Sequence, residues 1–206
     1  MSSEESIKRI VPVVKVPYEL VQSVKPASTI LYAKLLALNR KFKTITTSRE
    51  TLAQYQHCGV DYISKQISEL SSLGWVIVEY NHIGGKTTWQ IFPLMRNKKP
   101  YLAIPYQILN DVQQGTISYR EALLCSLIYD DAFKHGQRQS ALSNQKMALI
   151  LNLNERTIRR NLGQLYKKDY VFCMDDEKHQ RLLEVNIQYQ SEKEVSEYFN
   201  GLNEVY

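Results

Sequence analysis

Three arginines lie close together in residues 155–168, which read "ERTIRRNLGQLYKK". Ile158, Leu162 and Leu165 recur at the spacing of one helix face, so the arginines project from the other side. A guanidinium group donates hydrogen bonds in a planar fork, which fits phosphate oxygens or the two acceptors of guanine. The segment therefore predicts a helix that binds nucleic acid, with a merely solvated helix face as the alternative.

The polar side of this helix supplies the predicted DNA contacts of the second half of the chain. Arginine suits guanine there, and Asn161 suits adenine. Lys167 and Lys168 at the C-terminal end are expected to contact phosphate, or simply to complement the helix dipole. The predicted base-contacting residues of this helix are Arg156, Thr157, Arg159, Arg160 and Asn161.

An earlier block of the chain repeats the pattern. Residues 48–76 align over residues 143–171 without a gap, at an offset of 95, and their apolar positions coincide. Upstream, residues 14–22 resemble residues 102–110 at an offset of 88. A repeat of this length predicts two domains of one kind. The expected parts are an N-terminal domain (1–95), a basic linker (96–101), a C-terminal domain (102–187) and an acidic amphipathic C-terminal helix (188–206).

Both copies predict the same elements in the same order. A short extended segment ending in Pro-Tyr leads into a first helix, at 29–41 or 118–133, which begins at a serine or threonine suited to capping. A second, short helix follows Ser48 in the first copy and Ser143 in the second, which again are natural N-cap residues.

A third helix and a hairpin complete each copy. The helix covers 60–73 or 155–168, with Asp61 or Asn154 able to cap its start. In the first hairpin, Gly84-Gly85 can supply the positive φ angles of a two-residue turn. A turn centred there pairs Tyr80 with Trp89, Val78 with Ile91 and Glu79 with Gln90. The second hairpin has a longer, charged turn.

This series of elements resembles the winged helix-turn-helix DNA-binding superfamily, in forms found in bacterial plasmid and phage replication proteins. The residues that carry the resemblance are "VPYELV" (16–21) and "TSRETLAQYQHCGVDYISKQISELSSLGWV" (47–76). The resemblance implies a mainly α fold with small β hairpins (α+β), built as two tandem winged-helix domains. It also implies that the third helix of a copy enters the major groove and that the hairpin lies along the DNA backbone.

The third helix of the first copy has a different surface. Residues expected to be exposed there are Asp61, Tyr62, Ser64, Lys65, Gln66 and Ser68. Charged residues of helix 60–73 sum to −1, whereas those of 154–168 sum to +4. The second copy is therefore the better candidate for base reading. Tyr62, Ser64 and Lys65 are predicted base contacts of a weaker kind, and pairing with another subunit is the alternative.

Several residues outside the third helices are expected to contact phosphate. They lie at the N-terminal end of the second helix, in the first hairpin and in the basic linker, where positive charge can follow the DNA backbone. Together with Lys167 and Lys168 they are Ser48, Arg49, Lys86, Thr87, Lys98, Lys99 and Ser143.

The tail after residue 187 has a composition of its own. Val195, Tyr198, Phe199 and Leu202 recur at helical spacing, and residues 188–206 hold one Lys and four Glu. Such a segment could cover the apolar side of a domain, join two subunits or contact a partner protein.

Other classes of protein find little support. The 206 residues carry a net charge of +5, and the three cysteines are far apart without metal-ligand spacing. No phosphate-binding loop or nucleophile motif occurs, and the four histidines are scattered. We expect no catalytic residue, no metal site and no cofactor. An apolar span of membrane length and a signal-peptide core are also missing from the sequence, which predicts a cytoplasmic protein without a membrane partner.

The resulting hypothesis is a sequence-specific double-stranded DNA-binding protein that is not an enzyme. The resemblance points to a plasmid or phage replication initiator or accessory replication protein, which would have host replication proteins and a second copy of itself as partners. A transcriptional repressor of mobile-element genes is one alternative. An adaptor that uses both winged helices for protein contacts is another.

Overall fold

A computed structural model describes residues 11–42, 44–83, 86–95, 100–175 and 181–187. We call residues 11–95 the N-terminal unit; its elements are β1 (Val13–Pro17), α1 (Tyr18–Ser23), α2 (Pro26–Lys41), β2 (Ile45–Thr47), α3 (Arg49–Tyr55), α4 (Val60–Ser72), β3 (Val76–Ile83) and β4 (Lys86–Pro93). We call residues 100–187 the C-terminal unit; its elements are β5 (Tyr101–Pro105), α5 (Tyr106–Gln113), α6 (Tyr119–Lys134), β6 (Gln139–Ser140), α7 (Asn144–Leu151), α8 (Glu155–Lys167), β7 (Val171–Asp175) and β8 (Arg181–Val185).

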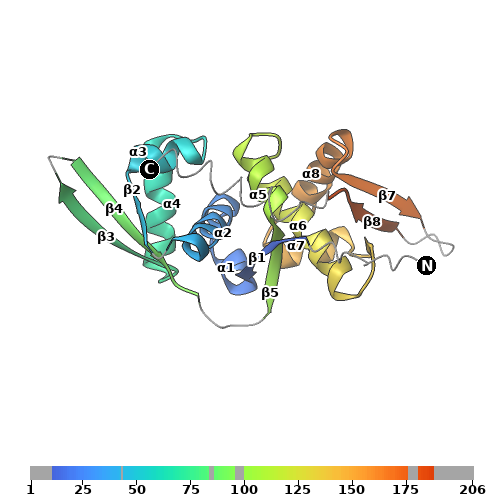
Figure 1. Cartoon of the computed structure of the whole chain (residues 1–206). Helices are drawn as coiled ribbons and strands as arrows, with labels where there is room; N and C mark the ends of the chain where they lie inside the picture. Colours follow the sequence, from blue (N-terminus) through green and yellow to red (C-terminus); the bar gives the residue numbers. More distant parts are fainter. Residues whose placement is uncertain (1–10, 43, 84–85, 96–99, 176–180, 188–206) are drawn as a thin grey trace, which may run out of the picture.

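The two units share one order of elements, so the repeat in the sequence is also a repeat in structure. Helices and small antiparallel sheets make up both. In Figure 1, β3 and β4 lie at one end of the molecule and β7 and β8 at the other, with β1 and β5 between them.

The first hairpin has the register expected from the sequence. Tyr80 lies opposite Trp89, and the other two expected pairs also form, with Glu79 opposite Gln90. Its turn at Gly84-Gly85 lies outside the described residues. Both hairpins gain a third strand that the sequence analysis missed, β2 beside β4 and β6 beside β8. These strands have only three and two residues, too few for a period-2 pattern to be recognised.

Helix starts follow the capping residues in most cases. Ser48, Ser143 and Asn154 each accept a hydrogen bond from the backbone N–H three residues on, and these predictions are confirmed. Ser118 forms a complete capping box with Glu121 before α6. The predicted start of the first helix was wrong, because α2 begins at Pro26, a residue favoured in the first turn. Asp61 lies inside α4, whose N-cap is Gly59.

Strands β1 and β5 pair with each other and join the two units. The register places Lys15 opposite Ala103, two residues that are 88 positions apart and equivalent in the repeat. Tyr18 donates its backbone N–H to the carbonyl of Pro100, and Tyr106 donates to Pro12 in the equivalent bond. The ribbon therefore has local twofold pseudosymmetry, with each unit contributing the same strand.

A single hydrophobic core runs through both units. Residues 27–38 of α2 are buried on every side, as expected for a helix that is apolar all round. Helix α2 packs against α6, and the core cluster is continuous from Val14 to Leu183. The two copies thus share a core, whereas the sequence analysis treated them as separate domains joined by a linker. No helix in the described ranges has the length and apolar character needed to cross a membrane.

Candidate nucleic-acid interface

Helix α8 presents two chemically different faces. Ile158, Leu162 and Leu165 are at most 3% exposed and hold the helix onto the core. Arg156, Arg159 and Arg160 are exposed, as the sequence analysis predicted. Asn154 caps the helix through a 2.7 Å hydrogen bond from the Thr157 N–H, which stabilises the first turn, where Arg156 lies.

The three arginines differ in their availability. Arg159 forms an ion pair with Glu155, with 2.7 Å between Nη2 and Oε2. Such an exposed pair contributes only about 0.3–0.5 kcal/mol and exchanges readily for another anion. Within the described part of the chain, Arg156 and Arg160 form no side-chain hydrogen bond or ion pair. Two guanidinium groups at the start of α8 are therefore free to bind an anion.

Asn161 does not belong to this exposed face. Its side chain is 6% exposed, and its Nδ2 atom lies buried without a hydrogen-bond partner. The predicted base contact by Asn161 was therefore wrong. Gln66 occupies the equivalent position of α4, was also expected to be exposed, and is 3% exposed. Both residues follow a buried isoleucine by three positions, which places them in the apolar stripe.

Lys168 is exposed but already has a partner within the protein. Its Nζ donates to both carboxylate oxygens of Glu121, at 3.1 and 3.2 Å, and to the carbonyl of Thr116. Burial alone would raise the pKa of Glu121, but hydrogen bonds from Ser118 and Lys168 outweigh it and lower that pKa. The lysine therefore ties the end of α8 to the start of α6, and a phosphate group would have to compete with Glu121 for it. Lys167 remains exposed.

Helix α4 offers a less basic surface. Lys65 is exposed and Tyr62 is 41% exposed. Ser64 is half-buried and donates its hydroxyl to the carbonyl of Val60, so it can still accept a hydrogen bond but has no free donor. Asp61 beside Tyr62 adds negative charge at the start of the helix.

The other predicted phosphate contacts have varied settings. Ser48 and Ser143 use their side-chain oxygens as helix caps, and the Ser48 hydroxyl also lies 3.1 Å from the hydroxyl of Thr51. Arg49 is exposed in the first turn of α3. Thr87 is exposed on β4, where its hydroxyl lies 3.1 Å from Nδ1 of His82. The side chain of Lys86, together with Lys98 and Lys99, lies outside the described residues.

Lys146 is a candidate that the sequence analysis missed. It is exposed in the first turn of α7, the helix that packs directly against α8. Its position three residues after the Ser143 cap places it at the N-terminal end of the helix, where unpaired backbone N–H groups favour anions. That spacing could have identified it.

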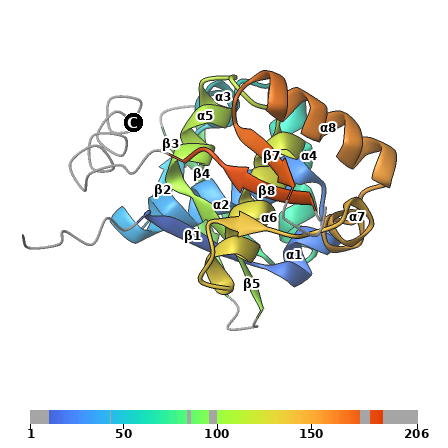
Figure 2. The same cartoon turned by 90° about the vertical axis from the view of Figure 1, so that its right-hand side faces the viewer.

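Helices α4 and α8 lie on the same side of the β1–β5 ribbon in Figure 2, whereas Figure 1 places them on opposite sides of the middle of the molecule. Both helices pack on the shared core.

A buried lysine lies apart from this surface. Lys34 is 1% exposed in the middle of α2, donates to Oε1 of Gln56 at 2.9 Å, and lies over the Tyr55 ring. Burial lowers its pKa to about 7, although the nearby Cys58 acts in the opposite direction. Lys34 is enclosed by the core and cannot reach a ligand at the surface of α8.

Metal binding has no site among the described residues, since no group of three or more His, Cys, Asp or Glu side chains is placed to hold an ion. No protein-family model matches the chain, no curated protein matches it, and no solved structure matches it.

Proposed function

We propose that this chain is a tandem winged-helix protein that binds double-stranded DNA at a specific sequence, with α8 in the major groove. The observation that carries the proposal is the pair of unpaired, exposed guanidinium groups of Arg156 and Arg160 on a capped helix whose other face is buried. Arginine at the N-terminal end of such a helix is suited to bidentate contacts with guanine.

The basic residues around α8 provide the nonspecific part of binding. Arg159 and Lys167 are exposed on α8, and Lys146 is exposed at the start of α7, where the exposed Ser143 adds a polar hydroxyl group. Cations on phosphate release counterions, so affinity should decrease with salt. The three-stranded sheet β6-β8-β7 would act as the wing of the C-terminal unit.

The N-terminal unit plays the lesser part in base reading. Its helix α4 carries one exposed lysine, Lys65, beside Asp61. In this proposal Arg49 and Thr87 contact the phosphate backbone, and Tyr62 and Lys65 add weak contacts. The protein acts in the cytoplasm as a plasmid or phage replication initiator or accessory protein, with a second copy and host replication proteins as partners.

The decisive experiment is a mobility-shift titration of the full chain on DNA selected from a random pool, repeated at several salt concentrations. Arg156→Ala and Arg160→Ala should each reduce specific affinity by about 1–3 kcal/mol and relax the preference at one base position. Lys65→Ala serves as the matched control on the equivalent helix and should have a smaller effect. Binding that is insensitive to salt and sequence would favour an adaptor instead.

The selected sequences also separate initiation from repression. An initiator of plasmid or phage replication should select direct repeats, because several copies of the protein assemble side by side on an origin. A repressor should select one palindrome, because a symmetric dimer covers two half-sites in opposite orientation.

A further inference from the structure

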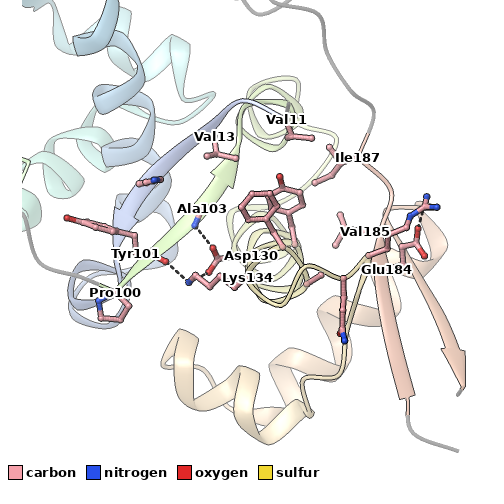
Figure 3. Close-up of a pocket in the computed structure, with 16 residues that line it drawn as sticks. Val11, Val13, Pro100, Tyr101, Ala103, Asp130, Lys134, Glu184, Val185 and Ile187 are labelled. Atoms are coloured by element: carbon pink, nitrogen blue, oxygen red, sulfur yellow. Dashed lines mark hydrogen bonds and ion pairs between the residues drawn. The ribbon is translucent and has the colours of Figure 1, made fainter. Parts of the chain in front are cut away.

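An apolar groove lies beside the β1–β5 ribbon at the C-terminal end of α6, with a volume of about 1010 Å³ (Figure 3). Val13 and Ala103 of the ribbon form one wall, and Val185 of β8 contributes to another. The rings of Tyr129 and Phe133 stack with centroids 6.0 Å apart, and Phe133 is 67% exposed. An exposed phenylalanine stacked on a half-buried tyrosine in a groove of this size indicates a surface that binds another polypeptide segment.

Both ends of the described chain border the groove. Val11 and Ile187 belong to its lining and lie close to each other at one rim in Figure 3. The acidic tail, residues 188–206, therefore begins at the groove itself. A segment attached at this point has a high effective concentration there, since it needs no separate encounter to bind.

The repeat shows where the chain goes after the equivalent hairpin. Asn186 donates its N–H to the carbonyl of Tyr170, as Leu94 donates to Trp75 in the N-terminal unit. The carbonyl of Leu94 then accepts a 2.8 Å hydrogen bond from the hydroxyl of Tyr32 on α2. Strand β8 packs against α6, the helix that carries Tyr129 and Phe133, so the described chain ends beside that helix.

The charges of the groove complement those of the tail. The two carboxylates in the lining already have partners, since Asp130 accepts from Tyr18, Lys134 and the Ala103 N–H, while Glu184 pairs with Arg138. Lys15 is exposed, and its side chain has no partner among the described residues. The tail has one lysine and four glutamates, so its net charge is −3.

We infer that the C-terminal tail of the same chain docks in this groove, with the apolar residues Val195, Tyr198, Phe199 and Leu202 against Tyr129 and Phe133. The tail covers Phe133, and one of its glutamates pairs with Lys15. No residue of the groove belongs to α4 or α8, so this inference does not depend on DNA binding.

Hydroxyl-radical footprinting of the full chain, read by mass spectrometry, measures the accessibility of individual aromatic side chains. Phe133 should be protected in the wild-type protein and should be oxidised several-fold faster in a Tyr198→Ser/Phe199→Ser variant. Phe172, which is 45% exposed on β7 outside the groove, is the internal control and should react equally in both. The reciprocal variant Phe133→Ser should increase oxidation of Tyr198 and Phe199.

Equal, rapid oxidation of Phe133 in wild type and tail variant would overturn the inference, because the groove would then be open. Protection that increases with protein concentration and survives in the tail variant would assign the groove to a second copy. Protection lost only in an Ile7→Ser/Ile10→Ser variant would assign it to the N-terminal segment. Circular dichroism checks that every variant is folded, and the two reciprocal variants probe the same contact from opposite sides.

Discussion

Lys15 lies directly opposite Ala103 in the β1–β5 ribbon, and the two residues hold the same position in the repeat. The ribbon therefore joins the units as identical strands are joined in a symmetric dimer. Long helices α2 and α6 pack beneath it in one continuous core. This relationship implies that the units fold and unfold together, which makes cooperativity a measurable property of the interface.

Tyr18→Phe tests that cooperativity. The Tyr18 hydroxyl donates to Asp130 of the other unit at 2.9 Å, so its removal should lower the free energy of unfolding by about 1 kcal/mol. Both tryptophans, Trp75 and Trp89, lie in the N-terminal unit, whereas circular dichroism reports on both units. In urea, the fluorescence and dichroism transitions should coincide in wild type and variant. Tyr80→Phe, at a 61% exposed position, is the control.

Two separate transitions, with only the fluorescence signal shifted, would show that the units unfold independently. Such a result would contradict a shared core as the source of stability.

Glu121→Gln tests the tie between α6 and α8. The buried carboxylate accepts from the Ser118 N–H and from Lys168, so the variant should lose about 1–3 kcal/mol of unfolding free energy at pH 7. The pKa of Glu121 lies below its ordinary value of 4.5. Its ionic contribution is therefore complete above pH 4.5 and is lost as the pH falls through the lower, folded-state pKa. Urea titrations at pH 7 and under acid conditions measure the difference.

The matched control is Glu79→Gln, a change of the same kind at an exposed position on β3. If the free energy of unfolding of Glu121→Gln stays below that of the wild type by the same amount down to strongly acid pH, the charge of Glu121 contributes nothing to stability.

Lys34→Met tests the buried lysine. The folded-state pKa of Lys34 is about 7, against an ordinary value of 10.5, because burial disfavours the charged form. At pH values between these two pKa values, the unfolded chain binds more protons than the folded chain, so the wild-type free energy of unfolding should rise with pH. Lys34 can contribute at most about 1.4 kcal/mol per pH unit to this rise. The variant should lack that increment. The difference between the two proteins, followed from pH 7 to 10, isolates it.

Lys65→Met provides the matched comparison, the same change at an exposed position. Parallel curves for wild type and Lys34→Met would show that Lys34 keeps its charge in the folded protein.

The sequence predicts most of this fold because its local signals agree. The capping residues, the alternation in the first hairpin and the repeat all point to the same elements, and the repeat appears in the structure. Helices α1 and α5 are not predicted from the sequence, since each is short and begins at the tyrosine of a Pro-Tyr dipeptide, which looks like the end of an extended segment. The pairing of β1 with β5 could not be foreseen, because it joins strands 88 residues apart.

The candidate site was predictable to a similar extent. The exposed arginines follow from helical periodicity alone. The burial of Asn161 is also predictable from the sequence, since this residue lies three positions after Ile158 in the same apolar stripe. The polarity of its side chain instead suggests an exposed position. The contact of Lys168 with Glu121 cannot be predicted from the sequence, because a local pattern does not identify a partner 47 residues away. Long-range polar contacts of this kind decide which basic residues stay free.

The contrast between Asn161 and Arg160 gives a final prediction, since these adjacent residues lie on different faces of α8. Asn161→Leu replaces a buried amide whose Nδ2 has no partner, so the free energy of unfolding should stay equal or increase. Its DNA affinity should match that of the wild type, whereas Arg160→Ala should bind more weakly and unfold at the same urea concentration. Urea titration and mobility shift on the same preparations measure both quantities. If Asn161→Leu alters base preference while its stability is unchanged, Asn161 reaches the DNA, and α8 must rotate or open to expose it.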